Sequence, residues 1–250
     1  MKKRRIDILI TSFGLAESRN KAQRLVMAGE VTVDGQLVHK SSDLFDPSCH
    51  IVIKTKPKYV SRGGLKLEKA IAKFNINDIE GKICADIGAS TGGFTDCLLQ
   101  NGAEKVYSVD VGFGQLHYSL RNNPNVIVME RVNVKDVKGF PEPIELVTID
   151  VSFISLKRIF PIVKYWCKQE TKMRVIALIK PQFEVGRKIA AKGRGVIRSD
   201  KERQKVVKDI LSAVQNEGFD VLGVTESPIK GPKGNVEFLT YLKLEPFKGE

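Results

Sequence analysis

Four charged residues, two lysines and two acids, lie beside stretches that the sequence predicts to be buried. Asp150 and Lys180 each directly follow an apolar run, Lys66 lies at the entry to the same part of the chain, and Glu237 precedes the last apolar run. A charged side chain next to a buried run is costly unless it is paired or used. Residue types alone therefore leave two interpretations, a set of structural ion pairs and a catalytic group of acids and bases.

A glycine-rich loop, Gly88-Ala-Ser-Thr-Gly-Gly-Phe94, follows the apolar run 82–87 and precedes a predicted helix over 95–100. A dinucleotide site has the pattern G-x-G-x-x-G, whose middle glycine lets the backbone approach a pyrophosphate. Ser90 occupies that middle position here. S-adenosylmethionine carries no phosphate, so the serine favours this cofactor, although a dinucleotide stays open on this pattern alone.

Two aspartates near the loop add to the cofactor hypothesis. Asp110 follows the apolar run 106–109 and would bind the ribose hydroxyls of either cofactor. Asp86 could meet an ammonium group, which S-adenosylmethionine alone of the two cofactors has. The candidate cofactor-binding residues are Asp86, Gly88, Ala89, Ser90, Thr91, Gly92, Gly93, Phe94, Asp110, Asn133 and Asp150.

The elements that must position these residues alternate between short apolar runs and helix-like stretches from residue 82 onward. This alternation predicts an α/β fold with a Rossmann-like, doubly wound and mostly parallel sheet. Ligands of such sheets bind at the carboxyl ends of the strands. Asp86, Asp110, Asp150 and Lys180 all lie at those ends, so the fold is expected to gather them at one edge.

The composition is that of a globular protein, with 42% hydrophobic and 28% charged residues in a chain of 250. The net charge is +12, and residues 1–62 contain 12 Lys and Arg against 6 Asp and Glu. A quarter of the chain thus carries half of the excess charge, which predicts a separate basic module. Such a positive field favours a polyanionic partner, and a solvated charged surface is the alternative.

The chain shows no pattern of a membrane or disulfide-rich protein. No apolar run approaches the roughly 20 residues of a membrane helix. The four cysteines include no C-x-x-C pair, which argues against a disulfide framework or a zinc site. The apolar spacing from Ile6 to Phe13 predicts an amphipathic helix rather than a signal peptide. We therefore expect a cytoplasmic protein without metal, membrane association or an obligate protein partner.

The segment 18–35, SRNKAQRLVMAGEVTVDG, combines a basic helix over 19–28, capped by Ser18, with a tight turn between two short strands. It resembles the RNA-binding domain named after ribosomal protein S4, over about residues 4–56. Phosphate contacts of such a domain give affinity and salt dependence rather than sequence choice. The residues that this resemblance assigns to the RNA backbone are Arg4, Arg5, Arg19, Lys21 and Arg24.

Six motifs occur in order along the chain: VSRGGLKL, DIGASTGGFTDCLL, VYSVDVGFGQL, TIDVSFISL, LIKPQFE and KGPKGNVEFL. Together they resemble the TlyA (hemolysin A) family of RNA ribose methyltransferases. The resemblance implies a small α+β RNA-binding domain over 1–56, a linker over 57–62, and an FtsJ-like, class I methyltransferase domain over 63–250. It also implies S-adenosylmethionine as the cofactor. The implied substrate is ribosomal RNA, with cytidines of one or both ribosomal subunits as the target.

In this fold class a Lys-Asp-Lys-Glu tetrad serves 2′-O-methylation, and the motif positions assign it to Lys66, Asp150, Lys180 and Glu237. Lys180 would touch the 2′-oxygen, either as a positive stabiliser of the developing charge or as the base. The two acids would orient and balance the lysines. Phe153 and Phe183 are candidates for stacking on a flipped nucleotide.

The segment 186–199 contains five basic residues, three glycines and no acid. It is interpreted as a loop beside Lys180 that could close on RNA, and a merely solvated loop fits the composition equally well. Its basic residues are Arg187, Lys188, Lys192, Arg194 and Arg198.

Two other function classes stay open at this point. A non-catalytic RNA-binding or assembly factor would keep the fold but lack cofactor binding. A membrane-active hemolysin, which the historical family name suggests, is disfavoured because the chain has no long amphipathic run with a tryptophan belt.

Overall fold

The computed structural model describes residues 3–54, 57–167, 172–185 and 193–245. The chain divides into two compact units, Met1–Pro57 and Lys58–Glu250. Arg187, Lys188 and Lys192 of the predicted basic loop lie outside the described residues.

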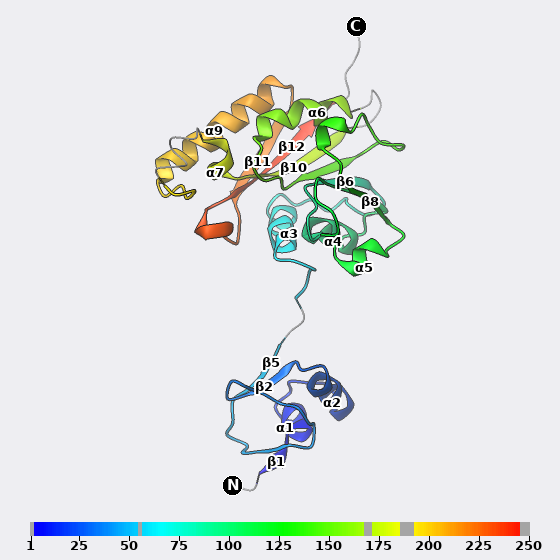
Figure 1. Cartoon of the computed structure of the whole chain (residues 1–250), viewed down its shortest axis with the longest axis vertical. Coiled ribbons are helices and arrows are strands. Elements are labelled where there is room, and N and C mark those ends of the chain that lie inside the picture. Colours follow the sequence, from blue (N-terminus) through cyan, green and yellow to red (C-terminus); the bar gives the residue numbers. More distant parts are fainter. Residues whose placement is uncertain (1–2, 55–56, 168–171, 186–192, 246–250) are drawn as a thin grey trace. The chain divides into compact units, whose positions relative to one another are not determined.

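The first unit combines two helices with short strands (Figure 1). Strands β2, β3 and β5 form one antiparallel sheet, and β1 pairs with β4. Ser18 caps α2 by accepting a hydrogen bond from the backbone N–H of Lys21, as the sequence predicts. The elements are β1 (Arg4–Arg5), α1 (Ile6–Ser12), α2 (Arg19–Met27), β2 (Val31–Val33), β3 (Gln36–Leu37), β4 (Leu44–Phe45) and β5 (Ile51–Ile53).

The apolar stripe of α1 forms the centre of this unit's core, with one exception. Ile6, Leu9 and Ile10 are buried against α2 and β2. Phe13 is 47% exposed because the helix ends at Ser12, before the spacing can bring this ring to the same face. The N-terminal arginines lie in β1 rather than in the helix.

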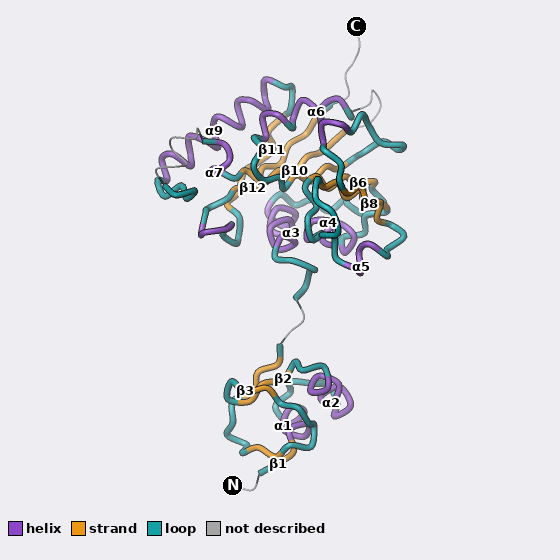
Figure 2. The backbone as a smooth tube through the Cα atoms, viewed as in Figure 1, coloured by secondary structure: helices purple, strands orange, loops and turns teal. Residues whose placement is uncertain are grey.

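The second unit contains a seven-stranded sheet in the order β11-β12-β10-β9-β6-β7-β8. Figure 2 draws its strands in orange. Strands β10, β9, β6, β7 and β8 are parallel, and β12 runs antiparallel to both of its neighbours. The mostly parallel, doubly wound fold is therefore confirmed. The strands are β6 (Ile83–Ile87), β7 (Lys105–Asp110), β8 (Val126–Glu130), β9 (Leu146–Ile149), β10 (Met173–Ile179), β11 (Asp220–Glu226) and β12 (Phe238–Leu244).

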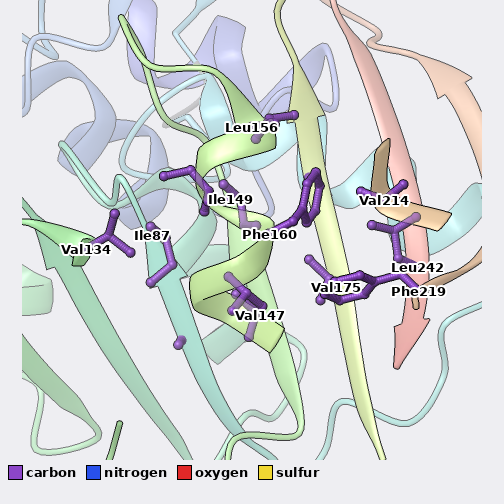
Figure 3. Packing of buried hydrophobic residues seen from close by; sticks show 14 of the residues in the cluster. Ile87, Val134, Val147, Ile149, Leu156, Phe160, Val175, Val214, Phe219 and Leu242 are labelled. Atoms are coloured by element: carbon purple, nitrogen blue, oxygen red, sulfur yellow. The ribbon is translucent and has the colours of Figure 1, made fainter. Parts of the chain in front are cut away.

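Helices cover both faces of this sheet. On one face, α6 and α9 bury Phe160 and Val214 against the strands (Figure 3). Val163 and Ile210 belong to the same cluster. On the other face, α3 and α4 bury Leu67 and Leu98. The helices are α3 (Gly63–Lys73), α4 (Gly93–Gln100), α5 (Tyr118–Arg121), α6 (Phe160–Tyr165), α7 (Pro181–Glu184) and α9 (Asp200–Asn216), with 3₁₀ turns at Val134–Asp136, Leu156–Arg158 and Pro232–Gly234. Among the described residues we find no helix with the length and apolarity that a bilayer crossing requires.

The stretch 57–62, expected to be a linker, differs from that expectation. The Tyr59 ring is buried against the α3–α4 face of the sheet. The backbone N–H of Val60 donates to Asp96 of α4, at 2.8 Å, and Gln100 donates to the carbonyl of Lys58, at 2.9 Å. Residues 58–62 are thus packed as part of the second unit, held by contacts that are distant in sequence.

Candidate active site

The glycine-rich loop leaves the end of β6 at the point where the strand order reverses, between β7 on one side and β9 on the other. Gly88 has a φ of +83°, and a Cβ there would lie 2.6 Å from the carbonyl oxygen of Asp150. Only glycine permits both this backbone conformation and this approach of the loop to the end of β9. The loop therefore borders Asp150 directly, at the switch point where α/β sheets bind ligands.

Asp86 lies beneath the loop rather than in a cavity. It is 0% exposed. Its carboxylate accepts three hydrogen bonds, from the backbone N–H and the hydroxyl of Thr95 at 2.9 and 2.7 Å and from the hydroxyl of Thr148 at 2.8 Å. The structure thus differs from the expectation that Asp86 meets a ligand's ammonium group. Asp86 instead joins the start of α4 to β6 and β9.

The burial of Asp86 predicts an unusual pH dependence. Desolvation outweighs the hydrogen bonds and raises the pKa of its carboxyl from 3.8 to about 6. Well below pH 3.8 the group is protonated in both states, whereas well above pH 6 the folded state must bury a carboxylate. The free energy of unfolding therefore falls by about 3 kcal/mol as the pH rises through this window.

The change Asp86→Asn removes this titration and keeps the size of the side chain. We expect its free energy of unfolding, relative to the unchanged protein, to increase by about 2 kcal/mol between pH 4 and pH 7. Urea unfolding followed by Trp166 fluorescence measures it, because this buried ring is the chain's single tryptophan. A relative stability that is constant with pH would contradict the raised pKa.

Asp110 ends β7 beside a cavity of about 410 Å³. Its two oxygens accept from the backbone N–H groups of Ser90, at 2.8 Å, and Gly112, at 2.7 Å. Ser90 also donates from its hydroxyl to Gln115, at 3.3 Å. The serine in place of the middle glycine thus adopts a positive φ of 50° and forms part of the cavity wall.

The same cavity fits the nucleoside part of a cofactor in size and chemistry. Its walls are mostly apolar, and Asp110 and Asn133 provide polar groups at its border. Apolar walls accommodate a base, and a carboxylate beside them can accept hydrogen bonds from ribose hydroxyls. Its lining comprises Ile87, Gly88, Ser90, Val109, Asp110, Val111, Gln115, Val132, Asn133, Val134, Asp150, Val151, Ser152, Phe153 and Ile154.

A second cavity, of about 310 Å³, adjoins the first and shares Gly88, Ser90, Asp150 and Ser152 with it. Its border combines the glycine-rich loop with the start of α3, the end of β10 and the turn before β12. It is lined by Ser61, Arg62, Gly63, Lys66, Gly88, Ala89, Ser90, Thr91, Gly93, Phe94, Asp150, Ser152, Lys180, Ile229, Lys230, Gly231 and Pro232. Gly92 lies outside both linings and packs on α5 instead.

Lys180 and Asp150 form an ion pair at this second cavity, with 2.5 Å between Nζ and Oδ1. The ammonium also donates to the hydroxyl of Ser152, at 2.9 Å. Asp150 follows β9 and Lys180 follows β10, and these neighbouring strands are parallel, so their ends meet. The sequence reasoning missed Ser152, although it lies in the TIDVSFISL motif two residues after Asp150.

Lys66 and Glu237 form a second, more deeply buried ion pair, with 2.6 Å between Nζ and Oε2. Glu237 is 1% exposed and precedes β12, which is antiparallel to β10 and therefore begins where β10 ends. A Cβ at Gly231 would lie 2.0 Å from Oε1 of Glu237, so the turn approaches this carboxylate as closely as glycine permits. The four charged residues are thus two ion pairs, and three of them line the second cavity.

Two family models match the chain: FtsJ-like methyltransferase over residues 59–244 and the S4 domain over 4–48. Hemolysin A from Brachyspira hyodysenteriae is 44% identical, with 95% of this chain and 98% of that protein covered. The 16S/23S rRNA (cytidine-2′-O)-methyltransferase TlyA from Mycobacterium tuberculosis is 38% identical, with 96% and 90% covered.

The chain belongs to the TlyA (hemolysin A) family of FtsJ-like methyltransferases. A solved structure from Streptococcus thermophilus that carries a provisional hemolysin name agrees with this assignment. It has 43% sequence identity and a TM-score of 0.70, and 98% of this chain and 90% of that chain are covered. The family resemblance stated from the six motifs is therefore confirmed.

The S4 unit of this TlyA-family chain separates its arginines into two groups. Asp7 is fully buried and accepts hydrogen bonds from Arg5, at 2.9 and 3.1 Å, Arg19, at 3.1 Å, and Gln23, at 2.9 Å. The Arg5 guanidinium holds the pKa of Asp7 well below its usual range, with Gln23 and Arg19 adding to the effect. Arg5 and Arg19 are therefore oriented by a buried acid that the sequence reasoning missed.

Lys21 and Arg24 line a separate groove of the S4 unit together with Lys54. The lining of this groove also includes the apolar side chains of Leu15, Leu25 and Ile53, together with Glu30. Arg4 is exposed on β1.

The aromatic candidates lie together beside the first cavity, whose lining includes Phe153. Phe153 is 90% exposed, has a φ of +64° and contacts the ring of Phe183, with 4.8 Å between ring centroids. A positive φ is rare for an aromatic residue and marks strained backbone. Glu184 accepts from the hydroxyl of Ser155, at 2.6 Å, and from the N–H of Leu156, at 2.8 Å, which ties this strained turn to α7.

Proposed function

We propose that this protein transfers a methyl group from S-adenosylmethionine to the 2′-hydroxyl of cytidine in ribosomal RNA. The observation that carries the proposal is the meeting of two ion pairs, Lys180–Asp150 and Lys66–Glu237, beside a nucleoside-sized cavity. Relatives named as rRNA (cytidine-2′-O)-methyltransferases, at 37–38% identity, support the substrate class. The S4 unit supplies the means to bind RNA, and an RNA substrate of this kind implies a cytoplasmic location.

The reaction needs a nucleophilic oxygen aligned with a methyl group. S-adenosylmethionine supplies a methyl group that the sulfonium charge already activates. Lys180, held by Asp150 and Ser152 at the cavity, would contact the 2′-oxygen and stabilise its negative charge or accept its proton. Asp110 and Asn133 would hold the nucleoside part of the cofactor. Lys66 and Glu237 would hold together the part of the second cavity's wall that α3 and the turn before β12 form.

Methyl transfer to ribosomal particles tests the function directly. We expect tritium from labelled S-adenosylmethionine to enter RNA of subunits isolated from cells that lack this activity, and nuclease digestion to release 2′-O-methylcytidine. Small subunits, large subunits and protein-free rRNA serve as separate substrates. Cofactor binding without transfer to any of them would contradict the proposed reaction, and the absence of cofactor binding would favour a non-catalytic assembly factor.

A further inference from the structure

Asn235 lies in the turn between β11 and β12, and its side-chain amide joins two loops. It is 3% exposed. Its Oδ1 accepts from the backbone N–H of Ile197, at 3.1 Å, and its Nδ2 donates to the carbonyls of Gly195, at 2.9 Å, and Pro232, at 3.2 Å. We propose that Asn235 is a positioning residue, which fixes the basic segment 193–199 at the rim of the active site so that Arg194 and Arg198 bind the RNA strand. This inference rests on RNA being the substrate.

The amide is matched to its surroundings in a way that few side chains could reproduce. The amide oxygen accepts a hydrogen bond from one backbone N–H, and the amide nitrogen donates to two backbone carbonyls, so both ends of the asparagine amide are paired. Aspartate would keep the acceptor for Ile197 and present an oxygen to two carbonyls. Alanine would leave three backbone groups without this partner in a buried place, which is costly.

The contacts place the basic segment next to the second cavity. Pro232 lines this cavity, and the same amide nitrogen binds Pro232 and Gly195, the residue that follows Arg194. Asn235 is also two residues from Glu237, which pairs with Lys66. The Asn235 side chain thus connects the basic segment to the turn that precedes Glu237, a member of the candidate tetrad.

The segment is held from its other side as well. Arg203 of α9 donates to the carbonyls of Ile197 and Arg198, both at 3.4 Å, and Ile197 is buried. Arg194 and Arg198 are exposed, and neither forms an ion pair with a residue that the structure describes. Two cations are therefore presented to solvent on an anchored backbone. An anchored cation loses less entropy when it binds a phosphate than one on a free loop does.

The expected effect of Asn235→Ala is on RNA binding. We measure the dissociation constant for ribosomal subunits by filter retention at several salt concentrations, and the cofactor affinity by calorimetry. Asn235→Ala should weaken subunit binding about tenfold and reduce the slope of log affinity against log salt by about 1 to 2, as the loss of two phosphate contacts would. Cofactor affinity should stay unchanged, and the exposed control Asn216→Ala should change neither.

A double-mutant cycle separates positioning from a merely structural role. If Asn235 acts through the arginines, adding Arg194→Ala and Arg198→Ala to Asn235→Ala should weaken binding no further. The proposal would be overturned if the losses of affinity caused by Asn235→Ala and by the arginine changes multiplied, or if Asn235→Ala left the salt slope unchanged. Should Asn235→Ala fail to fold, Asn235→Asp replaces it in the same cycle. Because binding is measured without turnover, a protein that binds subunits but transfers no methyl group contradicts the proposed function only.

Discussion

Replacing Lys180 with alanine is expected to lower methyl transfer to ribosomal subunits by about 10²–10³-fold, the usual cost of removing one group that stabilises a developing oxyanion. The loss should appear in kcat, because the ammonium is needed most when the 2′-oxygen gains charge. The affinity for S-adenosylmethionine, measured by calorimetry, should stay close to that of the unchanged protein, since Lys180 does not line the nucleoside cavity.

Two further variants, a control and one that keeps the positive charge, test the role assigned to Lys180. Lys201→Ala removes an exposed lysine on α9 and should leave transfer unchanged. Lys180→Arg keeps the positive charge but cannot accept a proton at neutral pH, so partial activity would favour charge stabilisation and its complete loss would favour a base. Transfer at the normal rate by Lys180→Ala would refute the role assigned to this residue.

Replacing Glu237 with alanine is expected to lower the free energy of unfolding of the second unit by about 3–5 kcal/mol. The change leaves the ammonium of Lys66 buried without its carboxylate partner, 2.6 Å away in the structure. As a control, Glu217→Ala breaks the ion pair between Glu217 and Lys164, whose charged atoms lie 3.7 Å apart. Both side chains are more than a third exposed, so this change should cost about 0–1 kcal/mol. Chemical unfolding followed by Trp166 fluorescence measures both.

A double replacement then separates stability from function. Lys66→Met combined with Glu237→Leu removes both charges and fills the space with apolar atoms, so it should restore most of the lost stability. It should not restore methyl transfer if the pair maintains the active-site wall. A double variant that is stable and fully active would mean that this ion pair has no part in the reaction.

The alternation of strands and helices and the positions of the motifs could be predicted from the sequence because both depend on local patterns. Strand β12 lies in the last apolar run, directly after Glu237, and Ser18 caps its helix as expected. Asp86 and Asp110 look alike in sequence, each at the end of a buried strand, yet only Asp110 borders a cavity. The difference comes from Thr95 and Thr148, which bind Asp86 from other elements and which no local pattern indicates.

The stretch 57–62 and the arginines of the first unit show the same limit. Pro57 and Lys58 have the composition of a linker, but the burial of Tyr59 and the contact of Val60 with Asp96 depend on the folded position of α4. Arg4 and Arg5 are equivalent by charge. Only the structure shows that Arg5 binds the buried Asp7 and that Arg4 does not share this contact.

The antiparallel direction of β12 has a consequence for the order in which the active site forms during translation. Asp150 and Lys180 directly follow the parallel strands β9 and β10, whereas Glu237 directly precedes β12. Domains fold from the N-terminus as the chain emerges, so the S4 unit can fold while the last strand is still unsynthesised. A nascent chain can therefore have a folded S4 unit before the candidate tetrad is complete, and Lys66 has no ion-pair partner until Glu237 has been made.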